Sequence, residues 1–304
     1  MDSKSKKLLF IYNPTAGRGT IKPHIHDLVN TFTEAGYIVT IHPTQSALDG
    51  PRFIWEHAAE FDVIAISGGD GTLHECVNAL MTVPRDSRPA IGYIPAGSTN
   101  DFAVAHDISF NIPKAAEEIT AGYPTVYDLG QLGSYYFTYV AAFGIFTDVT
   151  YDTPQELKNT FGYLAYIFEG ASRLSTYKPQ HITVWADGEI IEDDFLLGMV
   201  TNSTCVGGIK IRREDISLHD GKSELFLVKN SSRPIDFIEL MASIARGDYS
   251  SPILIHRQVT NAAFESERPI VWTMDGEYGG SYESIRAHTC KDAIALMKKE
   301  EVIV

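Results

Sequence analysis

The sequence predicts an α/β fold in two domains, an N-terminal domain built on a parallel β-sheet and a C-terminal domain rich in β-strands. Three observations predict this. The chain has 304 residues, which is longer than one average domain. Over about the first 130 residues, short apolar runs alternate with amphipathic stretches, as in parallel sheets covered by helices on both faces. After about Asp128, longer runs follow, several with alternating polarity, which indicate further strands.

The N-terminal elements are expected in a regular order. A helix is indicated by apolar residues spaced three and four apart from Ile21 to Ala35, and Gly36 ends it. A second helix is expected over Pro51–Glu60, and a third begins near Leu73. Four apolar strands are expected around these helices, at Leu8–Tyr12, Tyr37–Ile41, Val63–Ile66 and Ile91–Ile94.

The C-terminal region is expected to be mainly β-structure with two inserted helices. One helix is marked by apolar residues from Leu157 to Ala171, and another follows Ser232 with Pro234 in its first turn. The expected strands are Tyr135–Ala142, His181–Ala186, Phe195–Thr201, Glu224–Lys229 and Pro269–Met274.

Composition excludes several classes of protein. The chain is 44% hydrophobic and 21% charged, with a mean hydropathy of −0.08, which excludes intrinsic disorder and coiled coils. Its formal net charge of −14 argues against a general nucleic-acid-binding surface. Cys76, Cys205 and Cys290 are far apart, so neither a disulfide framework nor a zinc site is expected. No run reaches the roughly 18 apolar residues of a membrane span. We therefore expect a cytoplasmic protein.

Glycine-containing loops follow the first, third and fourth expected strands. They are Asn13–Gly19 (NPTAGRG), Ser67–Thr72 (SGGDGT) and Pro95–Phe102 (PAGSTNDF). Because the carboxyl ends of parallel strands meet at one edge of the sheet, the three loops should converge there. Glycine lets the backbone approach a phosphate closely, and the N-terminus of a helix attracts it. Asp70 would repel a bare phosphate, so it favours a divalent cation between the two. The GxGxxG and Walker A patterns are both missing from the sequence.

Each motif also has a purely structural interpretation. Asp70 can serve as a helix cap in a tight strand-to-helix turn. Asp275-Gly276-Glu277 can be a hairpin turn, since Asp-Gly is a frequent turn pair. Asp220-Gly221 can likewise be a simple turn.

Together, the NPTAG, SGGDGT and PAGSTNDFA motifs resemble the catalytic domain of the diacylglycerol kinase and sphingosine kinase family, in particular its soluble bacterial lipid kinases. Similar segments follow at Tyr127–Gly130, Leu218–Gly221 and Asp275–Glu277, so the resemblance runs from about residue 8 to about residue 280. It implies a three-layer α/β nucleotide-binding domain over residues 1–128. A β-sandwich-like lipid-substrate domain is expected over 129–287, and a segment returning to the first domain over 288–304.

The resemblance also implies an activity. The protein would transfer the γ-phosphoryl group of ATP, with Mg²⁺, to a hydroxyl of diacylglycerol or a related lipid in an interdomain cleft. Asp70 and Asp128 would organise the catalytic Mg²⁺, and Glu277 would act as general base. The residues expected around ATP are Asn13, Pro14, Thr15, Ala16, Gly17, Thr44, Gly69, Asp70, Gly71, Thr72, Leu73, His74, Glu75 and Ser98.

A second, structural Mg²⁺ is implied in the loop before Glu224. Its ligands would be Ser217, Asp220 and Lys222, the first and last through backbone carbonyl oxygens, which hard cations accept. The sequence departs from the family pattern nearby, because His219 stands where Asn or Asp is frequent. Ala16, Ser98 and Val104 depart from it too, at positions where the family often has Ser, Thr and Arg. These departures bear on the substrate more than on the type of reaction.

Two other functions stay open. One is a NAD-kinase-like phosphorylation of a soluble nucleotide, and the other is a regulatory protein that binds nucleotide or lipid without turnover. A lipid kinase of phospholipid biosynthesis would need transient contact with a membrane, for which Lys210, Arg212 and Arg213 form the candidate basic cluster. The sequence leaves the oligomeric state open, with a homodimer among the alternatives.

Overall fold

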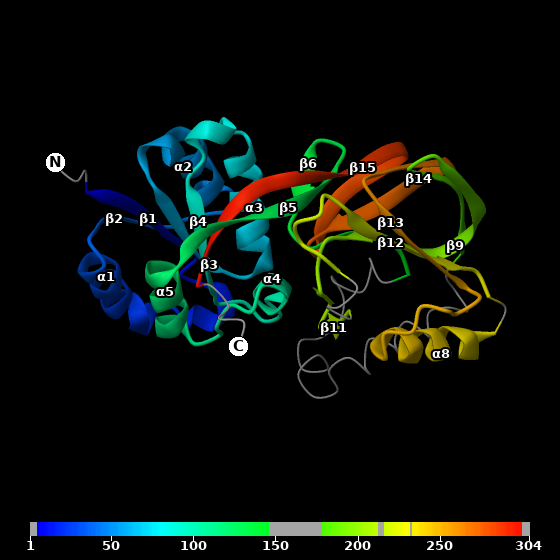
Figure 1. Ribbon diagram of the computed structural model, residues 1–304, viewed down its shortest axis with the longest axis horizontal. Coiled ribbons are helices and arrows are strands. Elements are labelled where there is room, and N and C mark those ends of the chain that lie inside the picture. Colours follow the sequence, from blue (N-terminus) through cyan, green and yellow to red (C-terminus); the bar gives the residue numbers. More distant parts are fainter. Residues whose placement is uncertain (1–4, 146–177, 212–215, 232, 300–304) are drawn as a thin grey trace. The chain divides into compact units, whose positions relative to one another are not determined.

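The computed structural model describes residues 5–145, 178–211, 216–231 and 233–299 (Figure 1). The chain forms two compact units, which consist of Met1–Tyr127 with Asp292–Val304 (unit 1) and of Asp128–Lys291 (unit 2). The boundaries therefore fall after residues 127 and 291, against 128 and 287 expected from the sequence. The helix expected from Leu157 to Ala171 and the basic residues Arg212 and Arg213 lie outside the described residues.

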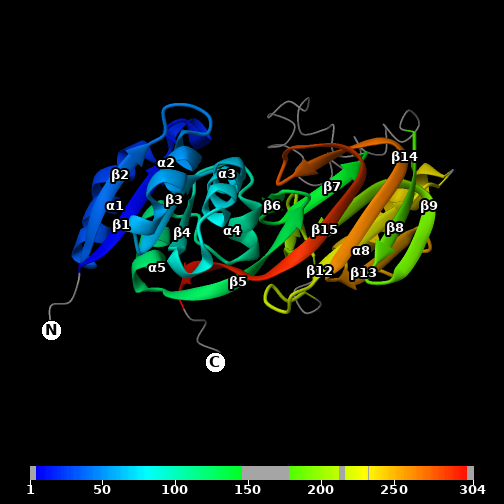
Figure 2. The same ribbon diagram turned by 90° about the horizontal axis from the view of Figure 1, so that it is seen from above.

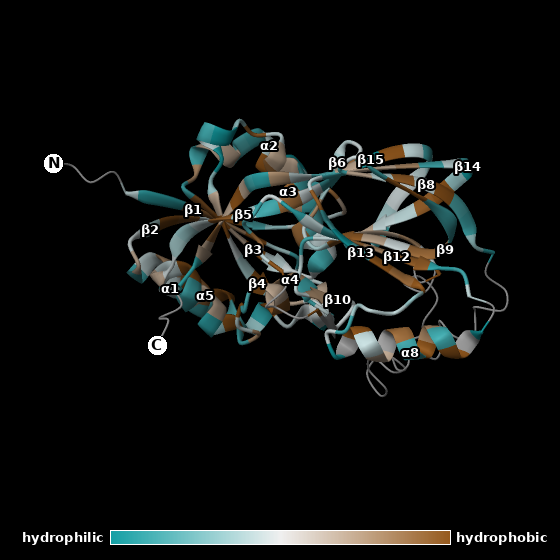
Figure 3. Ribbon diagram, turned by 45° about the vertical axis from the view of Figure 1, so that its right-hand side comes forward, coloured by the Kyte–Doolittle hydropathy of each residue, from teal (hydrophilic) through white to brown (hydrophobic). Residues whose placement is uncertain are grey.

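Unit 1 is built on a parallel sheet. Its strands β1 (Lys6–Tyr12), β2 (Tyr37–Pro43), β3 (Val63–Gly68) and β4 (Ala90–Pro95) pair in the order β2-β1-β3-β4. The end of β15 (Glu277–Lys298) adds a parallel partner to β4 through Leu296 and Ile91. The expected apolar strands are confirmed. Figure 3 shows hydrophobic residues gathered along them.

Helices cover both faces of this sheet, so unit 1 has three layers. Helices α1 (Ile25–Glu34) and α5 (Ile112–Ala121) lie on one side of the strands, and α2 (Asp49–His57) and α3 (Asp70–Met81) lie on the other (Figure 1). The short helix α4 (Asp101–Ala105) follows β4. Single 3-10 turns occur at Ala16–Gly19, Lys22–His24, Ala58–Glu60 and Arg85–Ser87.

Unit 2 is a β-sandwich-like domain. Its antiparallel strands include β7 (Val140–Gly144), β8 (Gln180–Ala186), β9 (Glu189–Thr201) and β14 (Asn261–Met274). Strands β9 and β14 each pair with β7 along one stretch and with β8 along another, so these four strands close around an apolar core. The remaining strands are β5 (Tyr123–Leu132), β6 (Tyr135–Phe137), β10 (Cys205–Val206), β11 (Ile209–Lys210), β12 (Ser223–Lys229) and β13 (Leu254–Val259).

Aromatic rings fill the core of unit 2. Trp272 packs edge-to-face against Phe143 and Phe264, with ring centroids 4.9 Å apart in both pairs. Such pairs add about 0.5–1.5 kcal/mol each beyond the burial of their surface. On the outer face of β12, Phe226 and Val228 pack against α8 (Pro234–Ala245), whereas Leu225, on the opposite face, belongs to the core. Strand β12 is therefore buried on both faces.

The chain passes from unit 1 to unit 2 through β5 and returns through β15. These two strands pair with each other and run side by side in Figures 1 and 2. Among the described residues, no helix is both long and apolar enough to cross a membrane.

Candidate active site

Three loops of unit 1 converge at the carboxyl ends of β1, β3 and β4. The loop after β4 touches the loop after β3 backbone to backbone, because a Cβ atom on Gly97 would overlap the Cα atom of Gly69. The loop after β1 touches the loop after β4, since a Cβ on Gly17 would overlap the carbonyl oxygen of Ala96. Gly17 also has a φ of 52°, a conformation that favours glycine. Glycine is thus required where these loops meet.

Asn13 connects the first loop to the second. Its side-chain Oδ1 accepts hydrogen bonds from the backbone N–H (2.9 Å) and the hydroxyl (2.8 Å) of Thr15, which shapes the turn after β1. Its Nδ2 donates to the Thr72 hydroxyl in the first turn of α3 (3.4 Å). The Thr44 N–H donates to the carbonyl of Tyr12 at the end of β1 (3.0 Å). These contacts gather several of the expected ATP residues at one edge of the sheet.

The N-terminus of α3 lies at this meeting point. Gly69 is its N-cap residue, in an extended conformation with φ −87° and ψ −178°. The first bond inside the helix runs from the Leu73 N–H to the Gly69 carbonyl (3.1 Å). The N–H groups of the residues between them point out of the end of the helix. Together with the helix dipole they form a site that attracts anions such as phosphate.

Asp70, the first residue of α3, supports a different helix. Its carboxylate oxygens accept hydrogen bonds from the backbone N–H groups of Asp101 (3.2 Å) and Phe102 (3.4 Å), in the first turn of α4. The structural interpretation of Asp70 as the cap of its own helix is therefore wrong, because Gly69 is the N-cap of α3 and the Asp70 carboxylate bonds to the first turn of α4. These bonds orient a half-buried carboxylate, which is a ligand type that Mg²⁺ prefers. The expected magnesium role stays a prediction.

Tyr93 is a residue of this site that the sequence analysis missed. Its hydroxyl lies 3.0 Å from the carbonyl oxygen of Gly68 and 3.3 Å from Oδ1 of Asn100. Burial, and then the charges of Asp70 and Asp101, raise the pKa of Tyr93. The hydroxyl therefore stays protonated and ties the loop after β3 to the loop after β4. The signal that could have revealed Tyr93 is its polar hydroxyl in the expected strand Ile91–Ile94, which is otherwise apolar.

Replacing Gly97 with Ala is expected to separate the two loops. The new Cβ would overlap the Cα of Gly69 and lie 2.8 Å from Oδ1 of Asn100. We expect the free energy of unfolding to fall by about 1–3 kcal/mol, as in other overpacked sites. ATP affinity should fall about tenfold or more, because 1.4 kcal/mol of lost binding is a factor of ten. Urea denaturation and calorimetric titration with ATP measure the two effects.

The control for Gly97→Ala is Thr99→Ala, an exposed position in the same loop. Unchanged ATP affinity in the glycine variant would contradict this role for the loop contact.

In unit 2, Asp128 is enclosed by the expected metal loop. The side chain is 3% exposed. The Asp128 backbone N–H donates to the carbonyl of Leu218 (3.0 Å), and its carboxylate Oδ2 accepts from the N–H of Gly221 (2.6 Å). The residue assigned to the catalytic Mg²⁺ and the loop assigned to the structural Mg²⁺ are therefore directly bonded. A substitution in this loop should therefore affect Asp128, and a substitution of Asp128 should affect the loop.

The three expected ligands of the structural Mg²⁺ lie in this exposed loop. The carboxylate of Asp220 accepts a hydrogen bond from the N–H of Lys222 (3.0 Å), and the Ser217 hydroxyl accepts one from the N–H of His219 (3.3 Å). These bonds are those of a turn. The described residues contain no cluster of three or more His, Cys, Asp or Glu side chains that could hold a metal. A site that uses backbone carbonyls does not need such a cluster, so this metal site stays a prediction.

Asn202 is bonded to the main chain of Asp128 and carries a further oxygen. Its Nδ2 donates to the Asp128 carbonyl (3.0 Å), while its buried Oδ1 has no hydrogen-bond partner among the described residues. A carboxylate and an amide oxygen are hard donors of the kind that magnesium and its water shell use. The residues at this position therefore fit a hydrated divalent cation.

The Asp275-Gly276-Glu277 motif forms a hairpin turn, as one interpretation expected. Asp275 and Gly276 join β14 to β15 with φ values of 50° and 84°, and Met274 pairs with Glu277. Both turn residues have positive φ, as a two-residue turn of type I′ requires. The turn places the two carboxylates of the motif in opposite environments.

Asp275 is structural, whereas Glu277 is available for chemistry. The Asp275 side chain is 3% exposed and accepts four hydrogen bonds of 2.7–3.1 Å, from three consecutive backbone N–H groups and one hydroxyl of Thr138–Val140. Glu277 is exposed, and among the described residues no hydrogen bond or ion pair engages its carboxylate. The expected role of Glu277 as general base stays a prediction.

Replacing Asp275 with Asn is therefore expected to destabilise unit 2. The amide nitrogen cannot accept a hydrogen bond, so at least one buried N–H group loses its acceptor. We expect a loss of about 2 kcal/mol or more in the free energy of unfolding, because unsatisfied buried groups typically cost about 1–3 kcal/mol and more beside a charge. Urea denaturation measures it, with Glu277→Gln as the matched control. Equal stability of the two variants would show that the four bonds do not support the hairpin.

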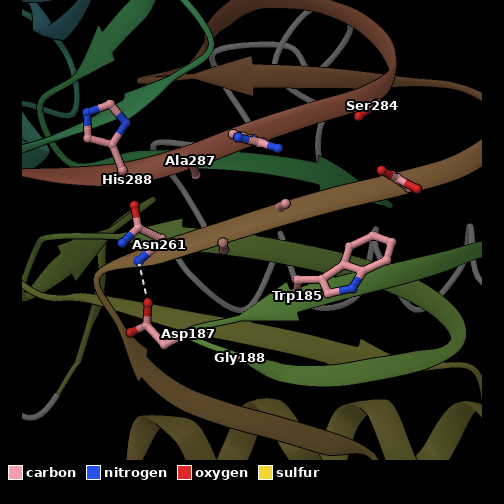
Figure 4. A pocket seen from close by; sticks show the side chains of 11 residues that line it. Trp185, Asp187, Gly188, Asn261, Ser284, Ala287 and His288 are labelled. Atoms are coloured by element: carbon pink, nitrogen blue, oxygen red, sulfur yellow. Dashed lines mark hydrogen bonds between the residues drawn. The ribbon is translucent and has the colours of Figure 1, made fainter.

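A pocket of about 680 Å³ lies on the outer face of β8, β14 and β15 in unit 2. Figure 4 shows it, with Trp185, Asn261 and His288 among the residues that line it. Ala263 pairs with Trp185 on one side and with Arg286 on the other, so a small side chain between two large ones makes the hollow. None of the residues expected to act in catalysis lines this pocket.

Similarity to known proteins decides the family. The chain is 34% identical over 299 residues to the diacylglycerol kinase of Bacillus subtilis, covering 97% of this chain and 98% of the relative. The chain belongs to the diacylglycerol kinase family. Residues 7–132 match the diacylglycerol kinase catalytic domain, and residues 140–296 match the YegS C-terminal NAD kinase beta sandwich-like domain. The diacylglycerol kinase of Staphylococcus aureus is 31% identical over 280 residues, or 90% of this chain and 87% of the relative.

Solved structures share the two-domain fold. The crystal structure of a diacylglycerol kinase from Bacillus anthracis has a TM-score of 0.77 at 24% identity, covering 99% of this chain and all of that one. A second structure from that organism reaches a TM-score of 0.83, also at 24% identity, over 100% of this chain and 99% of the other. The α/β domain followed by a β-sandwich-like domain is thus the fold of this diacylglycerol kinase family member.

Proposed function

We propose that this member of a lipid kinase family is an ATP-dependent kinase that phosphorylates a hydroxyl of diacylglycerol or a related lipid. The observation that carries the proposal is the meeting of three loops at the N-terminus of α3. Gly17, Gly69 and Gly97 allow the backbones of these loops to touch. Such a surface holds the phosphates of a nucleotide through N–H groups and the helix dipole. The family and its relatives support a lipid as the acceptor.

Each unit contributes a separate part of the chemistry. In unit 1, the loops and the first turn of α3 bind and orient the triphosphate of ATP. The carboxylates of Asp70 and Asp128 would hold Mg²⁺, which when bound neutralises charge on the phosphates. In unit 2, Glu277 accepts the proton of the lipid hydroxyl while the hydroxyl oxygen of the lipid attacks the γ-phosphorus of ATP. The bond to the β-phosphate oxygen breaks, and ADP leaves.

Two other functions compete with this proposal. A NAD-kinase-like activity would use the same loops for a soluble acceptor, and the name of the second matching domain refers to NAD kinase. A regulatory protein that only binds nucleotide or lipid has no need of a general base, and the exposed carboxylate of Glu277 favours an enzyme. The full-length relatives named diacylglycerol kinase favour a lipid acceptor.

Transfer of label from ATP distinguishes the three functions. The full chain would be incubated with γ-labelled ATP, Mg²⁺ and detergent-dispersed dioleoylglycerol, with NAD and glycerol in parallel reactions. We expect label in the organic phase with dioleoylglycerol alone. Label on NAD would support the soluble nucleotide, and ATP binding without transfer to any acceptor would support a regulatory protein.

Membrane contact is expected to depend on the basic cluster of Lys210, Arg212 and Arg213. The net charge of −14 opposes binding to anionic bilayers, so attraction has to be local. Three basic residues contribute about 3 kcal/mol near an anionic surface. The Debye length is only about 8 Å at physiological ionic strength, so binding to phosphatidylserine vesicles should fade by about 0.5 M NaCl.

Cosedimentation with vesicles tests the basic cluster. Replacing the three residues by Gln should abolish binding and leave activity on detergent-dispersed short-chain substrate mostly intact. The control replaces Lys114, Arg246 and Arg268, which are exposed basic residues elsewhere in the chain. Equal loss of binding in both triple variants would mean that overall charge, rather than this cluster, controls attachment.

A further inference from the structure

Asn202 has a buried oxygen that nothing in the described chain uses. It follows directly after β9 and is 3% exposed. Its Nδ2 donates to the backbone carbonyl of Asp128 (3.0 Å), but its Oδ1 is buried and has no hydrogen-bond partner among the described residues. Leaving a buried acceptor unsatisfied costs about 1–3 kcal/mol. Proteins that keep such a group usually satisfy it with a water molecule, an ion or a ligand.

The structure determines which way this amide points. If the side chain were rotated by half a turn, Oδ1 would face the Asp128 carbonyl, and two acceptors would meet. Its neighbours do not compete for the oxygen. The Thr201 hydroxyl donates to the carbonyl of Tyr139 (2.5 Å). The Ser203 hydroxyl donates to the carbonyl of Cys205 (2.7 Å) and accepts from the N–H of that residue. Oδ1 is therefore held toward a position that no described protein donor fills.

Asp128 is the residue that Asn202 holds in place. The polar contacts that fix it include its N–H to Leu218, its carboxylate to the Gly221 N–H, and its carbonyl to Asn202. The first two come from the loop expected to bind metal, and the third comes from the end of β9. Asn202 thus links Asp128 to the closed strands of unit 2.

We propose that Asn202 is a positioning residue for Asp128, and that its Oδ1 accepts a hydrogen bond from the water shell of a divalent cation held by that carboxylate. The inference rests on the proposed kinase function. Magnesium in proteins usually keeps several water molecules, and their hydrogens need acceptors. An amide accepts such a bond without adding a charge beside the buried carboxylate. It also donates to the Asp128 carbonyl, which a second carboxylate could not do.

Outer-shell partners of this kind usually change metal affinity by about 10- to 100-fold when they are removed. Asn202→Leu has a similar volume and lacks both the donor and the acceptor. We expect it to weaken Mn²⁺ binding to the full chain by about 10-fold or more, measured by electron paramagnetic resonance without nucleotide, with Mg²⁺ as competitor. ATP affinity without metal should stay within a few-fold of wild type.

Asn202→Asp separates the two roles of the amide. It keeps an acceptor and loses the donor to the Asp128 carbonyl, so we expect a Mn²⁺ affinity between that of wild type and that of Asn202→Leu. If the leucine variant does not fold, Asn202→Asp decides the question, because wild-type affinity in it would show that the amide donor does not position Asp128. Ser203→Ala is the matched control, because Ser203 is a buried neighbour whose hydroxyl bonds locally to Cys205.

Three results would overturn the proposal. They are wild-type Mn²⁺ affinity in a folded Asn202→Leu variant, wild-type affinity in Asn202→Asp, and a loss in Ser203→Ala equal to that in Asn202→Leu. The first would mean that Oδ1 serves no cation, and an ordinary water would then account for it. Failure of the lipid kinase assay is distinguishable, because it would leave the Mn²⁺ titrations unchanged.

Discussion

Replacing Glu277 with Gln is expected to lower turnover by roughly 100- to 10,000-fold, the usual contribution of a general base. The carboxylate is exposed, and no other described residue bonds to it, so the amide should fit without moving the hairpin. ATP affinity should stay within a few-fold of wild type, because the base acts on the acceptor hydroxyl. Steady-state kinetics with dioleoylglycerol and calorimetric titration with ATP measure the two quantities.

Stability separates this effect from damage to the fold. Glu277→Gln should change the free energy of unfolding by less than about 0.5 kcal/mol, as is usual for exposed positions. Asp275→Asn, two residues earlier, should lower both stability and activity. If ATP binding collapses in Glu277→Gln, this residue is a metal ligand or a structural group, and the base lies elsewhere.

Replacing Asp70 with Asn is expected to lower turnover by at least about 100-fold, since removing a central electrostatic group commonly costs about 3–4 kcal/mol of barrier. The structure adds an expectation for the fold. The Asp70 carboxylate accepts hydrogen bonds from the backbone N–H groups of Asp101 and Phe102. The amide of the Asn variant keeps only one accepting oxygen for these two donors. We therefore expect a loss of about 1 kcal/mol in the free energy of unfolding. Kinetics at saturating ATP and urea denaturation measure both.

Asp62 offers the matched control in the same unit. Its carboxylate also accepts a backbone N–H, that of Lys7 (2.7 Å), but it lies outside the three loops. Asp62→Asn should lose comparable stability and keep near-wild-type turnover. Near-wild-type turnover in Asp70→Asn would remove Asp70 from the mechanism, and an equal fall in both variants would assign the effect to the fold.

The sequence predicted the elements whose signals are local. Apolar runs indicated the four parallel strands of unit 1, because strands buried on both faces tolerate few polar residues. Glycine-rich loops at their ends indicated where phosphate would bind. Helix α5 was not predicted, although Asn111 caps it by accepting a hydrogen bond from the N–H of Lys114 (3.0 Å). The extent of β15 was not predicted either, because alternate residues of this strand face solvent and its apolar signal is weak.

The partners of the site residues were decided by tertiary structure alone. The carboxylate of Asp275 accepts hydrogen bonds from Thr138–Val140, which precede it in the chain by 135 to 137 residues. The backbone carbonyl of Asp128 accepts a hydrogen bond from Asn202, 74 residues later. No spacing rule encodes such pairs, because they depend on which strand ends the fold brings together. Local patterns in the sequence therefore determined the strands, the loops and the residue types of the site. Only the packing of distant segments decided which carboxylate supports the backbone and which remains available for chemistry.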